Sequence, residues 1–332
     1  MKPAMEIQHI SFANADELMD AANSDYIRFS IPKPGCTASQ MSLVTLGGIR
    51  CIRHAFQFAG NAEGCTPANV YSFLFSLDGM VFCKGKPYLE NILVVHPPGD
   101  HFFNHAQGPN VFFGIYIPRH VWESWVIARH GAVLGLKSGR IAVEPAKFSR
   151  IQKLVLEMFE AGNSVFGNHL PLGDSEILLA NLLDALASIV FPDRTIDPEY
   201  LEEHDFRLFL HGLRIMDTHG DLHISMEQIA DELDISKRKL QMLFNQQSGL
   251  SPLRLMILRR MSLVRQEIRD RRQTKKSIAE IAIHHGFWHL GRFAALYRKI
   301  FGELPSQTVP GPEDSCRSLK NKFGIRDDFF FC

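Results

Sequence analysis

The sequence predicts a multi-domain α+β protein, in which a β-rich, barrel-like domain with helices precedes an all-α domain. Short runs of apolar and aromatic residues, separated by turn residues, fill the first part of the chain and predict strands. Capped segments with apolar residues three and four positions apart fill the C-terminal part and predict helices. With 332 residues, the chain is long enough for two domains that each bury a core.

Composition describes a globular chain that is not a membrane protein. The hydrophobic fraction is 45% and the charged fraction 22%, which is typical of soluble domains. We see no apolar run of about 18 residues and no basic segment followed by an apolar core, so we expect a cytoplasmic protein with no membrane partner. Six cysteines without CxxC spacing predict reduced structural thiols, and we expect neither a metal nor another cofactor.

Charge is distributed unevenly, although the net charge is zero. Residues 1–204 contain 15 Lys and Arg against 21 Asp and Glu, whereas residues 205–310 contain 17 against 11. A basic C-terminal domain on an acidic N-terminal one suggests a nucleic-acid binder joined to a second module. An ordinary bias of solvated charges is the alternative that charge alone leaves open.

Five short runs predict the strands of the first domain: 41–46, 49–58, 70–77, 91–96 and 111–117. Turn residues such as Gly47-Gly48 and Asp78-Gly79 separate them. Before them, residues 1–35 show little periodicity apart from a possible short helix at 15–22. Short strands with frequent turns indicate a small barrel or sandwich.

Three histidines, His96, His101 and His105, surround a Pro-Pro-Gly turn and raise the possibility of a metal-bearing, cupin-like barrel. Their spacing lacks the close His-x-His pair and following Glu of metal cupins, so we expect ordinary loop histidines and no metal site. The mouth of a small barrel is nevertheless a common place for a ligand. Although core packing accounts for most of the phenylalanines, we predict an effector cavity lined by Phe73, Phe75, His96, Phe103 and Phe112.

Helices are expected at 119–129, 145–161 and 173–191, and the Pro-containing segment 192–201 is the expected linker. The third helix has an apolar surface that is wide for a helix with one neighbour. It can pack on the barrel or against the same helix of a second subunit, and sequence does not separate these uses. We therefore expect residues 1–191 to form an effector-binding and dimerisation domain of a homodimer.

The C-terminal domain, 202–310, contains the same helix-turn-helix pattern twice, at 225–247 and 277–301. Ser225 and Gln228 form a capping box, and Ser225 repeats at Ser277. A helix predicted at 252–271 separates the two units. Twenty residues span about 30 Å, close to the ~34 Å between successive major-groove faces of DNA. One chain can therefore enter two adjacent major-groove segments.

Several motifs occur in order within residues 207–308: Met226-x-x-Ile229-Ala230, Ser236-x-x-x-Leu240-x-x-x-Phe244, Gly249-x-Ser251-Pro252 and Ile278-x-x-Ile281-Ala282. The most diagnostic is Gly286-Phe287 followed by Phe293, Tyr297, Phe301-Gly302 and Pro305-Ser306. This region resembles the DNA-binding domain of AraC/XylS-family transcription regulators. The stretch around Gly286-Phe287-Trp288 also resembles the ethanolamine-utilisation regulator branch, although the N-terminal half does not suggest the same effector.

The resemblance implies a bacterial, cytoplasmic, sequence-specific transcription regulator that binds double-stranded promoter or operator DNA and associates with the nucleoid when bound. It implies RNA polymerase as a partner if the protein is an activator, and a small-molecule effector that is still unknown. Arg238 and Gln241 match base-reading positions, whereas Met242 departs from the basic residue often found there. The expected DNA contacts are Ser236, Lys237, Arg238, Gln241, Met242, Asn245, His289, Leu290, Arg292, Ala295 and Arg298.

Two other functions remain alternatives at this point. One is a cupin-like β-barrel enzyme fused to a DNA-binding domain, but the sequence shows no nucleophile–base pair, phosphate loop or complete metal triad, so we expect no enzyme. The other is a constitutive DNA-binding protein without an effector, which would leave the aromatic barrel unused. The tail, 311–332, has no clear role.

Overall fold

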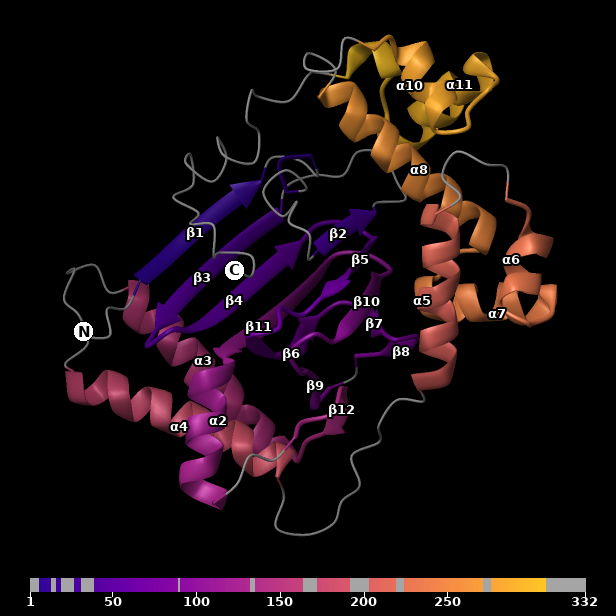
Figure 1. Ribbon diagram of the computed structural model, residues 1–332. Helices are drawn as coiled ribbons and strands as arrows, with labels where there is room; N and C mark the ends of the chain where they lie inside the picture. Colours follow the sequence, from indigo (N-terminus) through magenta and orange to yellow (C-terminus); the bar gives the residue numbers. More distant parts are fainter. Residues whose placement is uncertain are drawn as a thin grey trace.

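The computed structural model describes residues 6–12, 16–18, 27–30, 39–88, 90–131, 135–163, 172–191, 203–218, 224–270 and 276–308. Within these ranges the chain forms a β-rich N-terminal domain and a helical C-terminal domain, which confirms the predicted fold class (Figure 1). The expected linker, 192–201, and the tail, 311–332, lie outside the described residues.

The N-terminal domain contains two antiparallel sheets. The larger sheet has seven strands in the order β1 (Glu6–Phe12), β3 (Ser39–Leu46), β4 (Ile49–Phe56), β11 (Asn110–Pro118), β6 (Val70–Asp78), β9 (Ile92–His96) and β12 (Gly139–Ala142). The smaller sheet has five strands in the order β2 (Ile27–Ser30), β5 (Gly60–Cys65), β10 (His101–Ala106), β7 (Val81–Cys83) and β8 (Lys86–Pro87).

Glycine geometry explains the tight connection between β3 and β4. Gly47 and Gly48 have φ of 56° and 82°, which is the left-handed region that a two-residue hairpin turn requires at both central positions. The turn fixes the register, so that Leu46 pairs with Ile49 and Val44 with Cys51. All four of these side chains are buried in one core.

Three helices cover one face of the larger sheet: α2 (Arg119–His130), α3 (Pro145–Asn163) and α4 (Leu172–Val190) (Figure 1). Phe73 of the sheet packs against Trp122 of α2, with ring centroids 5.1 Å apart. Leu182 and Leu186 of α4 are fully buried in the same core. Packing within the chain therefore accounts for most of the apolar surface of α4, whereas Ile177 on this helix is exposed.

Several elements differ from the sequence-based expectation. Residues 1–35 contain β1 and β2, and His101 and His105 lie on strand β10 rather than in a loop. Strand β5 has the sequence GNAEGC, which lacks the apolar alternation that predicts a strand, and it forms because β2 and β10 both pair with it. Strand β5 is therefore specified by its neighbours rather than by its own composition.

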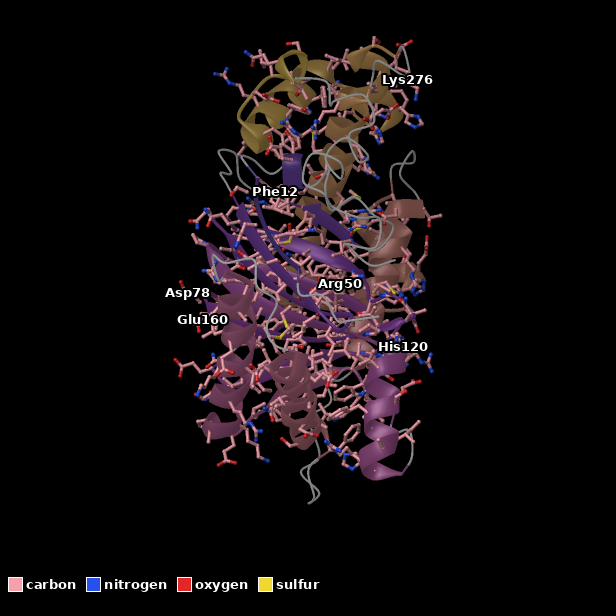
Figure 2. The ribbon with its side chains drawn as sticks, turned by 90° about the vertical axis from the view of Figure 1, so that its left-hand side faces the viewer. Phe12, Arg50, Asp78, His120, Glu160 and Lys276 are labelled. Atoms are coloured by element: carbon pink, nitrogen blue, oxygen red, sulfur yellow. The ribbon has the colours of Figure 1, made fainter. Side chains whose placement is uncertain are left out.

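The C-terminal domain is built from α5 (Glu203–Thr218), α6 (Met226–Glu232), α7 (Lys237–Ser248), α8 (Pro252–Arg269), α10 (Ile278–His284), α11 (Leu290–Phe301) and the 3-10 turn η1 (Pro305–Gln307). The six helices of this set share one apolar core. In the side view of Figure 2, labelled His120 and Glu160 lie on the helical layer of the N-terminal domain, and Lys276 lies at the opposite end of the molecule. None of the described helices is long and apolar enough to span a bilayer.

The two helix pairs repeat each other in detail. Ser225 and Ser277 each form a complete capping box with the residue three positions later. In the first turn the Ile235 amide donates to the Ala230 carbonyl at 3.0 Å, and in the second the Phe287 amide donates to Ala282 at 2.9 Å. The preceding residue has a positive φ in both copies, 52° in one and 82° in the other. Both turns are therefore formed by the same backbone hydrogen bond and a positive-φ residue before the donor.

Candidate nucleic-acid interface and effector cavity

Helix α7 presents a polar face to solvent from the first helix pair. Leu240, Leu243 and Phe244 are buried in the core, so the opposite face is exposed. Arg238 and Gln241 are exposed on it, and Met242 is 58% exposed. Long polar side chains on the free face of a second helix are the groups that read base edges in a major groove.

Two of the expected contacts on α7 already have partners. The Ser236 hydroxyl accepts the Lys239 amide at 3.1 Å, so this serine caps the helix. The Lys237 ammonium forms an ion pair with Glu227 of the preceding helix. Both residues are still exposed, and their contact with DNA stays a prediction. Asn245 is exposed one turn after Gln241.

Helix α11 presents the equivalent face of the second pair. The expected residues His289, Leu290, Arg292, Ala295 and Arg298 are all exposed. This face holds fewer long polar side chains than α7, as the sequence indicated. Sequence reasoning did not assign Trp288, which is 56% exposed beside this face; its place in the diagnostic motif, directly before His289, was the signal available.

The start of α11 differs from the starts of its neighbours. Serine side chains cap α6, α7, α8 and α10. Helix α11 begins after His289 without a side-chain cap. The first amides of a helix have no partner inside the helix, and an anion binds them favourably. Arg298 and Lys299 are exposed in the last turn of the same helix, at the end opposite this N-terminus.

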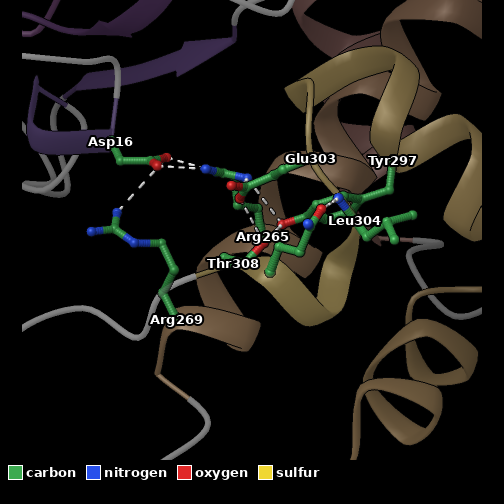
Figure 3. Close-up of polar contacts among 8 residues, drawn as sticks. Asp16, Arg265, Arg269, Tyr297, Glu303, Leu304 and Thr308 are labelled. Carbon is green, nitrogen blue, oxygen red and sulfur yellow. Dashed lines mark hydrogen bonds and ion pairs between the residues drawn. The ribbon is translucent and has the colours of Figure 1, made fainter.

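The second pair is connected to the N-terminal domain through Arg265 of α8 (Figure 3). Its guanidinium donates to both carboxylate oxygens of Asp16, at 2.8 and 2.6 Å, and to Glu303 at 2.8 Å. Burial opposes the charged form, but the hydrogen bond to Asp16 and the charges of Asp16 and Glu303 together outweigh it and raise the pKa of Arg265. Burial likewise favours the neutral acid at Asp16, yet Arg265 keeps the pKa of that carboxyl below its usual range.

A second connection lies at the middle of α8, where Arg259 is 5% exposed. Its guanidinium forms an ion pair with Glu63 of β5 and contacts the Asp217 carboxylate of α5 at 2.6 Å. Arg28 of β2 contacts the same Asp217 at 3.2 Å. Residues from both domains therefore surround one buried positive charge.

Strand β10 forms the apolar part of this contact, and α7 packs on it. The Phe103 ring meets the Phe209 ring of α5 edge-on, with centroids 4.9 Å apart. The His105 ring lies against Gly249, where an added β-carbon would be 2.2 Å from Nε2. We use the term domain interface for the contact of Glu63, Phe103 and His105 with Phe209, Gly249 and Arg259.

A cavity of about 120 Å³ lies between the two sheets. Its lining includes Phe29, Ala62, Phe102 and Asn104 from the smaller sheet and His54, Phe56, Ser72, Leu74, His96, Phe112 and Tyr116 from the larger. On β10, Phe102 and Asn104 line the cavity, whereas Phe103 and His105 face the C-terminal domain. One strand therefore separates the cavity from the domain interface.

The cavity corrects part of the predicted effector set. His96 and Phe112 line it as expected. Phe73 and Phe75 do not, because they project from the opposite face of β6 into the core beneath the helices. Phe103 does not line it either, because its ring packs on Phe209 of the C-terminal domain.

The pKa values of two histidines in the cavity wall are shifted in opposite directions. His54 is 5% exposed and stacks on Phe56 with centroids 3.8 Å apart, and burial lowers its pKa to about 3. Burial also opposes the charge on His96, but Nδ1 lies 2.6 Å from Asp100. The hydrogen bonds and charges of Asp100 and Cys83 together outweigh burial and raise the pKa of His96 to about 8. His54 is therefore neutral and His96 is a paired cation at neutral pH.

The His96–Asp100 pair predicts a pH-dependent stability. The folded-state pKa of His96 is raised from 6.5 to about 8. Its contribution to the free energy of unfolding is therefore fully present below pH 6.5 and is lost as the pH rises through 8. A shift of this size corresponds to about 2 kcal/mol. Urea unfolding at pH 6.5 and 8.5 measures the loss. We expect His96→Gln to reduce this pH dependence, whereas a substitution of exposed His101 should leave it intact; equal slopes would contradict the assignment.

One described cluster resembles a metal site by distance. Glu267, His284 and His285 offer ligand atoms within 4.8 Å of one another. The Glu267 carboxylate already pairs with Lys276 at 2.7 Å and with His285 Nε2 at 2.8 Å. Both of its oxygens therefore have partners, and we assign no metal to this cluster.

Two capped helix pairs, joined by α8 and each exposing its second helix, define a double helix-turn-helix DNA-binding domain. Comparison with family models agrees, because residues 229–309 match the model described as "Helix-turn-helix domain". Together with the relatives described next, this match shows that the C-terminal domain is an AraC/XylS-type DNA-binding domain.

Three relatives are named as regulators rather than enzymes. The XylDLEGF operon transcriptional activator 2 of Pseudomonas putida is 41% identical over 86 residues, which are 26% of this chain and 55% of that protein. A probable thc operon regulatory protein of Rhodococcus erythropolis is 30% identical over 123 residues, covering 32% and 37%. The transcriptional activator RhaS of Enterobacter sp. (strain 638) is 26% identical over 173 residues, covering 52% and 58%. Each match spans less than two thirds of the relative.

Two solved structures are similar at low identity. The AraC-like transcriptional activator CuxR has a TM-score of 0.43 and 14% identity, covering 77% of this chain and 94% of that one. ToxT from Vibrio cholerae O395 has a TM-score of 0.29 and 10% identity, covering 92% and 96%. Both TM-scores are below 0.5.

Proposed function

We propose that this protein is a sequence-specific DNA-binding transcription regulator, controlled through its N-terminal domain by a small-molecule effector or by dimerisation. The observation that carries the proposal is the pair of equivalent helices, α7 and α11, that expose polar faces on one helical scaffold. The named relatives are two transcriptional activators and a probable operon regulatory protein, which supports activation of transcription and RNA polymerase as a partner. Such a regulator acts on the chromosome, in the bacterial cytoplasm.

The two units have unequal roles in this proposal. Arg238 can donate two hydrogen bonds to guanine and Gln241 can pair with adenine, so α7 supplies most of the base reading. Helix α11 offers mainly His289 and Arg292 as polar contacts, together with an uncapped N-terminus and Arg298 for phosphates. Phosphate contacts position a protein on DNA and carry little sequence information.

Effector control has a physical route through β10. Residues of this strand alternate between the cavity and the domain interface, so a ligand that moves Phe102 or Asn104 also moves Phe103 and His105. A ligand shifts the arrangement of two domains only if it binds one arrangement more tightly than the other. The domain interface is the part of the molecule where such arrangements can differ.

The test of the proposed function begins with Arg238→Ala. DNA selected from a random pool by the full chain supplies the specific site. If Arg238 contacts guanine, the variant should lose about 1–3 kcal/mol of affinity for that site and much less for random DNA. Fluorescence anisotropy with both duplexes measures the difference.

Arg150→Ala is the matched control, because this exposed arginine lies on α3 of the N-terminal domain. It should leave both affinities unchanged. An equal loss on both DNAs for Arg238→Ala would reduce this residue to a phosphate contact, and failure to select any DNA sequence would contradict sequence-specific binding.

A further inference from the structure

We propose that Trp288 reads thymine in the DNA site of the second helix pair, by covering the C5-methyl group that thymine presents in the major groove. This residue would add base specificity to a helix whose other expected contacts are mostly to phosphates. Because it names the base that α11 recognises, the proposal rests on the proposed DNA-binding function.

Trp288 is an additional residue in the second helix pair. In the first pair, Ile235 is followed directly by Ser236, the N-cap of α7. In the second pair, Phe287 makes the turn hydrogen bond that Ile235 makes in the first. One further residue, Trp288, then stands before His289, the N-cap of α11. The second turn is therefore longer by one residue, and the addition places an indole at the start of α11.

The indole of Trp288 is directed to solvent rather than to the core. Its side chain is 56% exposed, whereas the preceding Phe287 packs on the core residue Phe293 with centroids 5.5 Å apart. Among the described residues, only Ile177 and Met242 are more exposed large apolar side chains. Met242 lies on α7, the equivalent helix of the first pair. A large aromatic side chain gains free energy when a partner covers it, so its exposure at this place indicates a contact surface.

Small residues on the exposed face of α11 allow a close approach to base edges. In the repeat, Gly291 stands where α7 has Arg238. Ala295 likewise stands where α7 has Met242. Packing does not require the glycine, since an added β-carbon at Gly291 would meet nothing within 4 Å. Without long side chains on this face, the helix can lie close to the groove floor, and the indole of Trp288 can reach the bases.

The chemistry of the indole selects thymine among the four bases. Thymine alone presents an apolar group, its C5-methyl, in the major groove. An indole has one donor and no acceptor, so it cannot make the bidentate contact that distinguishes guanine. It also has no acceptor for the amino groups of adenine and cytosine. Covering a methyl group is therefore the base-specific contact that Trp288 can make.

Positive charge on α11 favours DNA over an apolar protein partner for this surface. Arg292 is exposed in the first turn of the helix, and Arg298 and Lys299 are exposed in the last turn. The sequence of α11 contains no Asp or Glu. Phosphates complement these charges and hold the helix in register on the duplex. In Figure 1, α10 and α11 form the end of the molecule opposite α2, α3 and α4, so the helix layer leaves this end accessible.

Deoxyuridine tests the contact, because it lacks the thymine methyl group and keeps the hydrogen-bonding atoms of thymine. Each thymine of the duplex selected by the full chain is replaced singly, and affinity is measured by fluorescence anisotropy. We expect one replacement at least to weaken binding about fourfold, the ratio for one buried methyl group. At that position Trp288→Ala should bind both duplexes equally. A site without such a thymine, or the same loss in Trp288→Ala, would overturn the proposal.

Two further variants control for the loss of an exposed apolar side chain. Trp288→Phe keeps an aromatic ring and should keep most of the preference for thymine over deoxyuridine. Met80→Ala should keep all of it, since Met80 is 50% exposed between β6 and β7 of the N-terminal domain. A preference for thymine lost in Met80→Ala as well would contradict a specific role of Trp288.

Fluorescence quenching of the unmodified chain tests the contact without any variant. Trp122 is buried and Trp125 is partly buried, so Trp288 is the exposed member of the three tryptophans. The selected duplex should protect the acrylamide-accessible part of the fluorescence. Unprotected fluorescence in the specific complex would overturn the proposal even if Trp288→Ala fails to fold.

Arg238→Ala distinguishes failure of this proposal from failure of the proposed function. If that variant still separates the selected duplex from random DNA by its loss of affinity, while no deoxyuridine acts through Trp288, thymine reading by α11 fails and the regulator stands. If the full chain selects no DNA sequence, both fail.

Discussion

Glu63→Ala should destabilise the folded protein by about 3 kcal/mol, the lower end of the range for removing one partner of a buried ion pair. The variant leaves the Arg259 guanidinium buried at 5% exposure with a single carboxylate, that of Asp217. We expect the lower end because Asp217 stays within 2.6 Å. Urea unfolding of the full chain, followed by tryptophan fluorescence and circular dichroism, measures the change and shows whether the two domains unfold together.

A double-mutant cycle separates the ion pair from other effects. Arg259→Met combined with Glu63→Ala removes the buried charge along with its partner, so the double variant should be more stable than Glu63→Ala alone. Glu160→Ala is the control, because this glutamate is exposed on α3 (Figure 2), and it should have little effect. A loss for Glu63→Ala as small as the control would contradict a buried ion pair at the domain interface.

Local signals made the C-terminal domain predictable from sequence. The capping box at Ser225 and the repeat of this serine at Ser277 involve residues three positions apart. The apolar spacing of each helix likewise depends on residues within two turns. Short-range hydrogen bonding and periodicity therefore contain most of the information for these helices.

The contacts between the domains could not be predicted in this way. Arg259 and Glu63 are 196 positions apart, and Arg265 and Asp16 are 249 apart. In the sequence these arginines look like solvated residues of a basic helix. Their partners become apparent only when the tertiary fold brings α8 to the N-terminal domain.

The cavity was predictable only in part, because both faces of β6 are buried. Phe73 and Phe75 alternate with Ser72, Leu74 and Ser76, and it is the smaller residues that line the cavity. Alternation along a strand tells the two faces apart only when one of them faces water. On β11 the neighbour Phe113 packs on the helical layer while Phe112 faces the cavity, and the sequence gives no reason for this choice.

Gly249→Ala should lower the free energy of unfolding by several kcal/mol, because the added β-carbon pushes α7 away from β10 at the domain interface. This residue ends α7 with φ of 68°, where alanine is strained by roughly 1–2 kcal/mol. The added β-carbon would also lie 2.2 Å from His105 Nε2, and this ring is held by a 2.8 Å hydrogen bond between Nδ1 and Asn61. Forced overpacking adds typically 1–3 kcal/mol. Because Asn61 lines the cavity, the same variant should weaken any effect of a cavity ligand on DNA binding.

Gly131→Ala is the matched control for backbone strain. Gly131 ends α2 with φ of 75°, and an added β-carbon there meets nothing within 4 Å. The excess loss of stability in Gly249→Ala over Gly131→Ala therefore measures the clash at the domain interface. Adding His105→Ala removes the clash, so the double variant should regain that excess after the separate effect of His105→Ala is subtracted. Equal losses for the two glycine variants, with no gain from His105→Ala, would mean that α7 and β10 are not held together in solution, and β10 could not then transmit a signal to the DNA-binding domain.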